Sequence, residues 1–266
     1  MAPGAAIITG AASGLGREMA ALLRHAGWRT VLVDLPQALE AAGDLVDGHG
    51  PAPRIAAFDV RDAAAWRALH DDLRAEWPTL DLLVNCAGVG ATGEVGTLPE
   101  SQWRRVLDTN LLGTALGCET FLPWLRQHPH RSHVVNVASI AAILAPPSMA
   151  AYSASKAGVV ALSEAIAAEC PQGRPGVTVV CAGFFRSGLL DTWHFTGPVE
   201  AHEARRRMDA TRWDSRRVAG RVVRAVHANR RYVVVGTQAR WLWRLKRLAP
   251  RATTAMVRRV YRRLQR

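Results

Sequence analysis

A short apolar segment at the start of the chain leads directly into a glycine-rich turn. Residues 5–9 have the character of a buried β-strand, residues 10–16 contain three glycines, and residues 17–26 follow with a helical pattern. Glycine permits positive φ and close backbone approach, while the amides of a first helical turn attract a pyrophosphate. The pattern predicts a strand, a nucleotide-binding turn and a helix, although a tight βα connection without a ligand would look the same.

An acidic residue stands at the end of the next predicted strand. That strand covers residues 29–33 and is followed by Asp34, which lies 24 residues after Gly10. A carboxylate there can accept hydrogen bonds from the ribose hydroxyls of an adenosine and would repel a 2′-phosphate. We therefore expect NAD to be preferred over NADP. The alternative is that Asp34 only caps the turn before Pro36.

Lysine is almost absent from this basic chain. It occurs only at Lys156 and Lys246, and Lys156 follows Tyr152 by four residues in an alanine-rich stretch. Four residues are about one helical turn, so the phenol and the ammonium share a face. A neighbouring cation favours the phenolate, which lowers the pKa of the tyrosine and suits it to proton transfer. A solvated tyrosine and lysine on an ordinary helix would give the same short pattern.

Together these segments resemble the short-chain dehydrogenase/reductase family over about residues 5–236. The resemblance implies an α/β fold, a doubly wound parallel sheet of the Rossmann type in a single domain. Asp59 and Val60 match the family's adenine contact, and residues 85–88 match an element that stabilises the central sheet, with Cys86 in place of its second asparagine. The residues predicted to bind the cofactor are Gly10, Ser13, Gly14, Leu15, Gly16, Asp34, Asp59, Val60, Asn85, Ala87, Gly88, Tyr152, Lys156, Gly183, Phe185 and Ser187.

Four residues match the catalytic positions of that family: Asn110, Ser139, Tyr152 and Lys156. The resemblance implies that Tyr152 exchanges a proton with the substrate oxygen and that Ser139 hydrogen-bonds the same oxygen. It also implies that Lys156 holds the nicotinamide ribose and lowers the phenol pKa. Asn110, in a predicted helix at residues 101–127, would hold a water of the proton relay. In the alternative, Ser139 caps its strand (133–138) and Asn110 is a polar residue satisfied within its helix.

One segment departs from the family pattern. After the predicted strand 177–180, Ala182 stands where the family usually has proline and Ser187 where it has threonine. This stretch borders the nicotinamide in the family. We therefore expect a less rigid backbone there and a less certain carboxamide contact for Ser187.

Length and composition fit one domain with an extension. The 266 residues are 49% hydrophobic, and strands alternate with helices throughout, which predicts a catalytic domain at 1–239 with a parallel sheet. No apolar run approaches the ~20 residues that span a bilayer, and the first strand leaves no room for a signal peptide. The four cysteines and nine histidines show no metal or redox spacing. We expect reduced thiols, no metal, and a cytoplasmic or peripheral membrane location.

The expected substrate loop covers about residues 187–215. Apolar side chains occur there and in two neighbouring segments: Leu189, Leu190, Trp193, Phe195, Ile140, Ile143, Leu144, Phe184 and Phe185. His194 is expected to be a packing residue. Such a lining favours a hydrophobic or aromatic secondary alcohol or ketone over a free sugar. The alternative is that these side chains pack the loop onto the domain.

The positive charge is concentrated near the carboxyl end. Residues 1–202 carry a net charge of −5, whereas residues 240–266 contain ten basic residues and no acid. Apolar residues recur there at helical spacing: Trp241, Leu242, Leu245, Leu248, Met256, Val257, Val260, Tyr261 and Leu264, with arginines up to Arg266 between them. This basic amphipathic extension suits an anionic membrane surface, an acidic carrier protein, or packing within its own domain or a homodimer or homotetramer. Nucleic acid is not favoured, because no binding motif for it accompanies the charge.

The function expected from these observations is hydride transfer between a nicotinamide cofactor and a hydrophobic alcohol or ketone, with Tyr152 as the general acid/base. A redox-neutral epimerase or dehydratase that retains its cofactor is an alternative. A nucleotide-binding scaffold that acts through the basic extension is another. The presence of Asn110, Ser139, Tyr152 and Lys156 together favours the oxidoreductase, since binding alone does not need all four.

Overall fold

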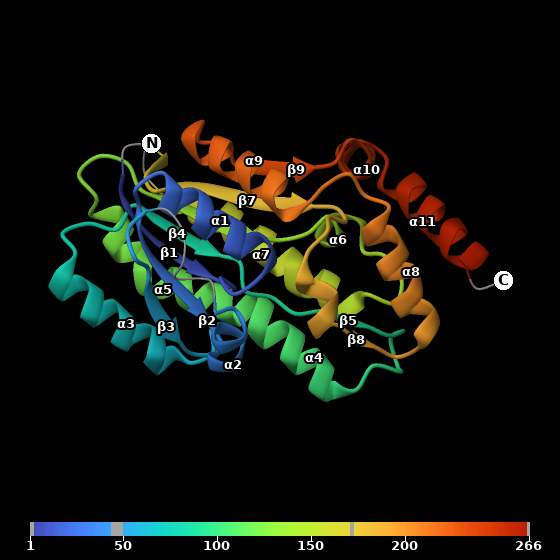
Figure 1. Ribbon diagram of the computed structural model, residues 1–266. Coiled ribbons are helices and arrows are strands. Elements are labelled where there is room, and N and C mark those ends of the chain that lie inside the picture. Colours follow the sequence, from blue (N-terminus) through green and yellow to red (C-terminus); the bar gives the residue numbers. More distant parts are fainter. Residues whose placement is uncertain (1–2, 44–49, 171–172, 265–266) are drawn as a thin grey trace.

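The computed structural model describes residues 3–43, 50–170 and 173–264, and its centre is a seven-stranded parallel sheet (Figure 1). The strand order is β3-β2-β1-β4-β6-β7-β9. The chain therefore builds the sheet outward from β1 in one direction and then from β4 in the other. Crevices for ligands form at the carboxyl ends of the strands where the order reverses. The strands are β1 Ala5–Thr9, β2 Arg29–Asp34, β3 Arg54–Ala57, β4 Leu82–Asn85, β6 His133–Val137, β7 Gly176–Ala182 and β9 Tyr232–Val235.

Helices cover both faces of the sheet, which confirms the predicted doubly wound α/β fold. They are α1 Gly14–His25, α2 Pro36–Ala41, α3 Ala63–Glu76, α4 Glu100–Leu107, α5 Gly113–Arg126, α6 Ala141–Leu144, α7 Ala150–Glu169, α8 Pro198–Asp209, α9 Ser215–His227, α10 Thr237–Leu248 and α11 Pro250–Leu264. Alternate residues of a strand point to opposite faces. Ile8 of β1 accordingly packs in the cluster with α1 and α9, while Ile7 packs with α3, α5 and α7.

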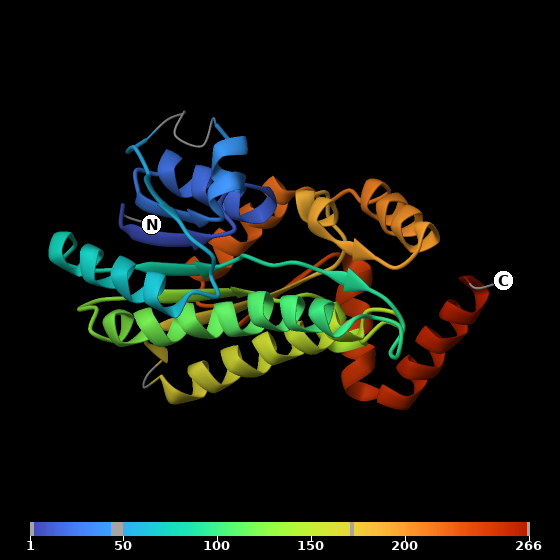
Figure 2. The ribbon, with the colours of Figure 1, turned by 90° about the horizontal axis from the view of Figure 1, so that it is seen from below.

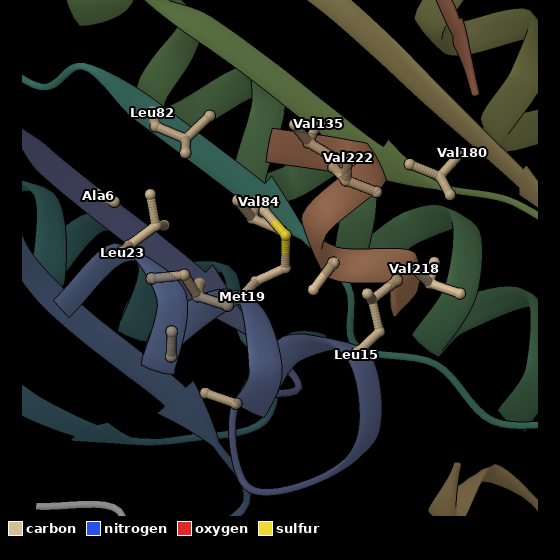
Figure 3. Packing of buried hydrophobic residues seen from close by; sticks show 14 of the residues in the cluster. Ala6, Leu15, Met19, Leu23, Leu82, Val84, Val135, Val180, Val218 and Val222 are labelled. Atoms are coloured by element: carbon tan, nitrogen blue, oxygen red, sulfur yellow. The ribbon is translucent and has the colours of Figure 1, made fainter. Parts of the chain in front are cut away.

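The packing of α1 and α9 fixes where the first helix begins. Figure 3 shows Met19 of α1 beside Val84 of β4, and Val218 and Val222 of α9 near Val135 and Val180. These side chains are almost fully buried. The helix starts at residue 14 rather than at the expected residue 17, since the extended Ser13 forms its N-cap directly after the glycine turn. The amino end of α1 is thereby set against the carboxyl ends of β1 and β4.

The helix expected at residues 101–127 is interrupted. α4 and α5 are separated by a π-helical turn, Asp108–Leu112, and Asn110 lies inside that turn and is fully buried. A π-turn adds a residue to the helical repeat, and such turns are frequent at functional sites. Here it lets the Asn110 side chain reach the loop after β4, where Oδ1 accepts a hydrogen bond from Val89 N at 2.8 Å and Nδ2 donates to Val89 O at 2.9 Å.

A second, two-stranded sheet lies at the carboxyl ends of the main strands. β5, Ala91–Thr92, pairs in parallel with β8, His194–Phe195. The pairing joins the loop after β4 to the segment that the sequence assigns to substrate binding. It holds this segment, together with the 3₁₀ turn Gly188–Thr192, beside the end of the sheet where the ligand crevice is expected.

Two helices follow the last strand. α10 starts two residues after β9, so the predicted division at residues 239 and 240 falls within it. Figure 2 shows α10 and α11 as a bent pair at the end of the molecule that also carries β5 and β8. Arg266 lies outside the described residues. No helix in the described part of the chain is both long and apolar enough to cross a bilayer.

A buried histidine at the start of β6 makes the folding stability sensitive to pH. The Thr178 hydroxyl donates to Arg230 O, so it accepts from His133 Nε2 at 2.8 Å. His133 Nδ1 has no hydrogen-bond partner within the described residues. Burial, with a smaller contribution from the charge of Arg131, lowers the pKa of His133 to about 3. The folded protein therefore holds this imidazole neutral.

We expect acid to destabilise the protein through His133. The folded-state pKa of His133 lies below the unfolded value near ~6.5. The contribution of His133 to the free energy of unfolding is therefore fully present above that pH and is lost as the pH falls toward 3. By pH ~5 the loss should be about 2 kcal/mol. Urea unfolding at several pH values measures this loss in the natural chain and in His133→Gln, a variant that keeps a donor toward Thr178. Parallel pH dependences for the two proteins would contradict this assignment.

Candidate active site

The glycine turn is compressed between the ends of β1 and β4. Gly10 has φ of +65°, and a Cβ on it would lie 2.9 Å from Ala87 N. A Cβ on Gly16 would lie 2.1 Å from Gly10 O, a distance that no side chain can adopt. The two glycines thus allow the backbone to fold back on itself. The amides of the first turn of α1 are left facing the crevice, without partners inside the helix.

Side chains tie this turn to the strands around it. Thr9 Oγ1 accepts hydrogen bonds from the amides of Cys86 and Ala87, at 2.9 and 3.0 Å. Asn85 Nδ2 donates to Asn136 Oδ1 at 2.9 Å, which links β4 to β6 in the interior. Thr9, Asn85 and Asn136 are all buried. They stabilise the ends of the central strands.

Asp34 lies where the sequence predicts a ribose-binding carboxylate. Its Oδ2 accepts from Ala12 N and its Oδ1 from Leu35 N, both at 2.9 Å. The carboxylate therefore anchors the glycine turn as well as its own loop, which agrees with the capping alternative, while the contact with an adenosine ribose stays a prediction. Each carboxylate oxygen has a second lone pair, and Asp34 lines the cleft, so acceptor capacity remains for hydroxyl groups.

The second acidic position is paired. Arg61 Nη2 donates to Asp59 Oδ2 at 2.6 Å, and Arg61 N donates to Asp59 Oδ1 at 2.9 Å. The hydrogen bond from the Arg61 side chain holds the pKa of Asp59 below its ordinary value. Asp59, Val60 and Arg61 all line the cleft. Arg61 was not predicted from the sequence, although its position directly after the Asp-Val pair was a signal.

One cleft of about 1350 Å³ joins these groups to the predicted catalytic residues. The predicted cofactor residues that line it are Gly10, Ser13, Gly14, Leu15, Asp34, Asp59, Val60, Ala87, Gly88, Tyr152, Lys156, Gly183, Phe185 and Ser187. Gly16, Asn85 and Asn110 do not line it. Gly16 packs against Gly10, while Asn85 and Asn110 are buried behind the wall. These three residues shape the cleft rather than face it.

Ser139 and Tyr152 meet at one end of the cleft. Ser139 follows β6, and its Oγ accepts from Ala141 N at 3.1 Å, while Tyr152 lies in the first turn of α7. Burial raises the pKa of the Tyr152 phenol to about 12, and a hydrogen bond with Ser139 opposes that shift. The sequence-based expectation of a lowered phenol pKa is therefore wrong for the protein's own groups. Desolvation is the largest contribution to this pKa and outweighs the hydrogen bond with Ser139. The ammonium of Lys156 lies 5.9 Å from the centre of the ring.

Lys156 is buried one helical turn after Tyr152, as predicted. Its Nζ donates to Val137 O at 2.8 Å. Burial lowers the pKa of this ammonium to about 8, and the nearby thiol of Cys86 acts in the opposite direction. Lys156 can therefore hold or release a proton close to neutral pH, which an arginine cannot.

Asn110 is held by several hydrogen bonds. Besides the pair with Val89, its Nδ2 donates to Ser155 Oγ at 2.9 Å, and its main-chain carbonyl accepts from Thr114 Oγ1 at 2.8 Å. The side-chain amide thus connects the loop after β4 with α7. Oδ1 and the main-chain carbonyl of Asn110 each accept one of these bonds and keep a second lone pair, so the predicted water contact stays a prediction.

Trp193 packs against Tyr152, the residue predicted to transfer the proton. The centres of the two rings are 4.8 Å apart, and Trp193 Nε1 donates to Thr92 Oγ1 at 2.7 Å. Gly90 makes room for the indole, since a Cβ there would lie 2.1 Å from it. Arg105 Nη2 donates to Gly90 O and Thr192 O, at 3.0 and 3.2 Å. These contacts hold the substrate loop against the loop after β4.

The rest of this end of the cleft is mainly apolar. Of the expected lining residues, Ile140, Leu144, Phe184, Phe185, Leu189, Leu190 and Trp193 line the cleft, whereas Ile143 and Phe195 do not. His194, which is expected to be a packing residue, does not line it either. Five further residues line the cleft that were not predicted to do so: Met149, Met208, Trp213, Leu242 and Val260. Leu242 and Val260 belong to α10 and α11. Their helical spacing was recognised, but it does not show which part of the domain the helices pack against.

The described residues fit a dinucleotide better than a metal. The glycine turn is a cradle that a Cβ would fill, and it opens onto a helix amino terminus beside a carboxylate, which are groups suited to pyrophosphate and ribose. Among described residues, no group of three or more His, Cys, Asp or Glu side chains could hold a metal ion. The four cysteines carry free thiols, as predicted, and burial raises the pKa of Cys86 to about 12.

Comparisons with known proteins agree with this geometry. The family described as short chain dehydrogenase matches residues 4–194. The probable oxidoreductase EphD of Mycobacterium tuberculosis is 32% identical over 262 residues, which are 94% of this chain and 44% of that protein. This chain thus spans less than half the length of that relative. D-threitol dehydrogenase of Mycolicibacterium smegmatis is 39% identical over 62% of this chain and 63% of its own.

A solved structure shares the whole architecture. The crystal structure of a short-chain dehydrogenase/reductase from Burkholderia phymatum in complex with NAD has a TM-score of 0.85 and 28% sequence identity. The match covers 92% of this chain and 93% of that one. The likeness extends beyond the segment that the family matches and includes most of the carboxyl-terminal quarter.

Proposed function

The chain belongs to the short-chain dehydrogenase family, and we propose that it is an oxidoreductase that uses NAD to interconvert a hydrophobic secondary alcohol and its ketone. The observation that carries this proposal is the single cleft. It has the glycine turn and Asp34 along one part, and Ser139, Tyr152 and Lys156 along the other. A protein that only bound a nucleotide would have no need of a buried phenol, hydroxyl and ammonium around the same space.

NAD fits the donor set of the cleft. The amides of the first turn of α1 would hold its pyrophosphate, Asp34 its adenosine ribose, and Lys156 its nicotinamide ribose. When bound, NAD accepts or supplies the hydride and, in its oxidised form, carries a positive charge. Asp34 supports NAD over NADP, because a 2′-phosphate beside this carboxylate would bring two negative charges together.

The chemistry of the protein's own residues centres on one proton. With its pKa raised by burial, Tyr152 is protonated at neutral pH and is ready to donate to a developing alkoxide when a ketone is reduced. Ser139 donates a hydrogen bond to the same oxygen and stabilises its charge. Lys156, whose pKa is about 8, receives and returns protons beside Tyr152. Asn110 acts as a positioning residue that fixes the loop at Val89 beneath the site.

The lining of the cleft supports a hydrophobic substrate. The indole of Trp193 packs against Tyr152, Met149 packs in the same cluster, and Ile140 and Leu144 line the same cleft. A polyol such as D-threitol, which one relative is named for, would leave hydroxyl groups without partners against such a wall. An unpaired buried polar group costs ~1–3 kcal/mol. An apolar substrate avoids that penalty and gains from its own burial.

A homodimer or homotetramer is part of the same proposal. The π-turn between α4 and α5 exposes Leu112, whose relative accessibility is 47%, on the outer side of the helix layer. An exposed leucine on a helix face is suited to self-association when a second copy covers it. Light scattering on the full chain and on Leu112→Asp tests this contact.

The test of the function is a coupled set of assays on the full chain. We expect NADH to form, at 340 nm, from NAD and a panel of aliphatic and aromatic secondary alcohols, with rates that rise as the alcohol becomes more apolar. Product formed without any net change at 340 nm would support the epimerase or dehydratase alternative. NAD binding by calorimetry without any product would support the scaffold.

A further inference from the structure

An apolar stripe on α10 faces away from the rest of the domain. Trp241, Leu245 and Leu248 follow one another at spacings of four and three residues and are 67%, 38% and 86% exposed. The opposite side of the same helix is covered, because Ala239 is buried and Trp243 packs against Tyr232. An indole and two leucines on one exposed helix face form the kind of patch that marks an interaction surface.

α11 continues this surface and joins it to the cleft. Met256 and Val260 are exposed by 38% and 47%, and Val260 also lines the cleft, as Leu242 of α10 does. The Tyr261 hydroxyl is hydrogen-bonded to Ser148 Oγ at 2.9 Å and to the carboxylate of Glu94. This contact fixes α11 beside the substrate end of the cleft, in the position that Figure 2 shows.

The charge around the stripe is positive throughout. Residues 240–266 contain ten basic residues and no acid. The exposed cations on the two helices include Arg240, Arg244, Arg247, Arg251, Arg258, Arg259 and Arg262. A two-fold contact between copies of this surface would bring these cations together, which is unfavourable. An anionic lipid surface can bind both the apolar stripe and the cations, because Trp and Leu insert at the acyl boundary and Arg contacts the headgroups.

We propose that the α10–α11 face docks on an anionic lipid bilayer and holds the substrate end of the cleft against it. The docking follows from exposure and charge alone. We also infer that an apolar alcohol or ketone enters the cleft from the bilayer past Leu242 and Val260. This second step rests on the proposed function. Basic residues at the headgroups and an indole at the acyl boundary anchor peripheral helices of this kind.

Vesicle co-sedimentation of the full chain tests the docking. We expect binding to vesicles of phosphatidylcholine mixed with phosphatidylglycerol. Binding should be weaker by at least about tenfold with pure phosphatidylcholine or at high salt, because the headgroup attraction is electrostatic and is screened. Failure of the full chain to sediment with the anionic vesicles at low salt overturns the proposal.

Matched variants locate the surface. Arg258→Glu with Arg259→Glu should weaken binding to anionic vesicles by at least about tenfold, and Trp241→Ser with Leu248→Ser should also weaken it. Arg67→Glu with Arg216→Glu changes the net charge by the same amount on exposed arginines of α3 and α9. It should leave binding within about twofold if the α10–α11 face is the contact. An equal loss in the two charge-reversal variants would mean that only total charge matters, and would overturn the assignment.

Two further measurements separate the other occupants and the proposed function. A lower mass by light scattering for Trp241→Ser with Leu248→Ser, without vesicles, would show that a second copy covers the stripe. Binding to soluble poly-glutamate, without binding to any vesicle, would indicate that an acidic protein docks on this face. Either result overturns the proposal.

Turnover of a water-soluble secondary alcohol with NAD, without lipid, should be the same in all variants. Vesicle binding by a protein with no such turnover would leave the docking intact and refute only the proposed function.

Discussion

Tyr152→Phe is expected to lower kcat by about 10²–10⁴-fold, the usual contribution of a positioned general acid or base. The variant removes only the phenol oxygen. The ring that packs 4.8 Å from Trp193, and the burial of the side chain, are kept. Its thermal midpoint and its affinity for NAD should therefore match those of the natural chain. Steady-state kinetics with the best alcohol of the panel measure the change.

The control for this prediction is a substitution at Trp193, a neighbour of Tyr152 that contributes no proton. Trp193→Phe keeps an aromatic ring over Tyr152 but loses the hydrogen bond to Thr92, so we expect it to change KM more than kcat. Near-normal kcat in Tyr152→Phe would mean that another group transfers the proton.

Reversal of the cofactor preference is the second large effect. Asp34→Asn combined with Leu35→Arg should shift the ratio of kcat/KM for NAD to that for NADP by about a hundredfold toward NADP. Two hydrogen bonds to a carboxylate are worth ~1.5–3 kcal/mol each, and a guanidinium can receive the phosphate. Asparagine keeps one oxygen for the Ala12 or Leu35 amide, which spares the glycine turn. Leu35 is already 37% exposed and tolerates a longer side chain.

Leu35→Arg alone separates the effect of the added guanidinium from the effect of removing the Asp34 carboxylate. It should raise the efficiency with NADP without lowering that with NAD, because Asp34 is intact. If the natural chain itself prefers NADP, the role given to Asp34 is wrong. Arg17, which follows the glycine turn and lines the cleft, would then be the first residue to substitute.

The fold was predictable because its signals are local. The apolar strand before Gly10, the glycines of the turn and the alternation of strands with helices each depend on neighbours in the sequence. The parallel sheet follows from them by the rules of βα connection. Tyr152 and Lys156 were predictable for the same reason, since one helical turn places both in the same cleft.

Other features of the site depend on distant contacts. The π-turn at Asn110 forms against Val89 and Ser155, which are 21 and 45 residues away. The approach of Trp193 to Tyr152 depends on the pairing of β5 with β8, two strands of two residues each. The raised pKa of Tyr152 reflects burial, which a motif does not report. Spacing in the sequence identifies the groups, whereas packing decides their environment.

The near absence of lysine gives this protein its own spectroscopic probe. Because Lys156 and Lys246 are the only lysines, selective ¹⁵N labelling of lysine would produce two side-chain signals in a protein of 266 residues. One belongs to an ammonium bonded to Val137 O and buried in the cleft, and the other to α10. The titration of the buried amine could thus be followed in the unmodified chain, without substituting any catalytic residue.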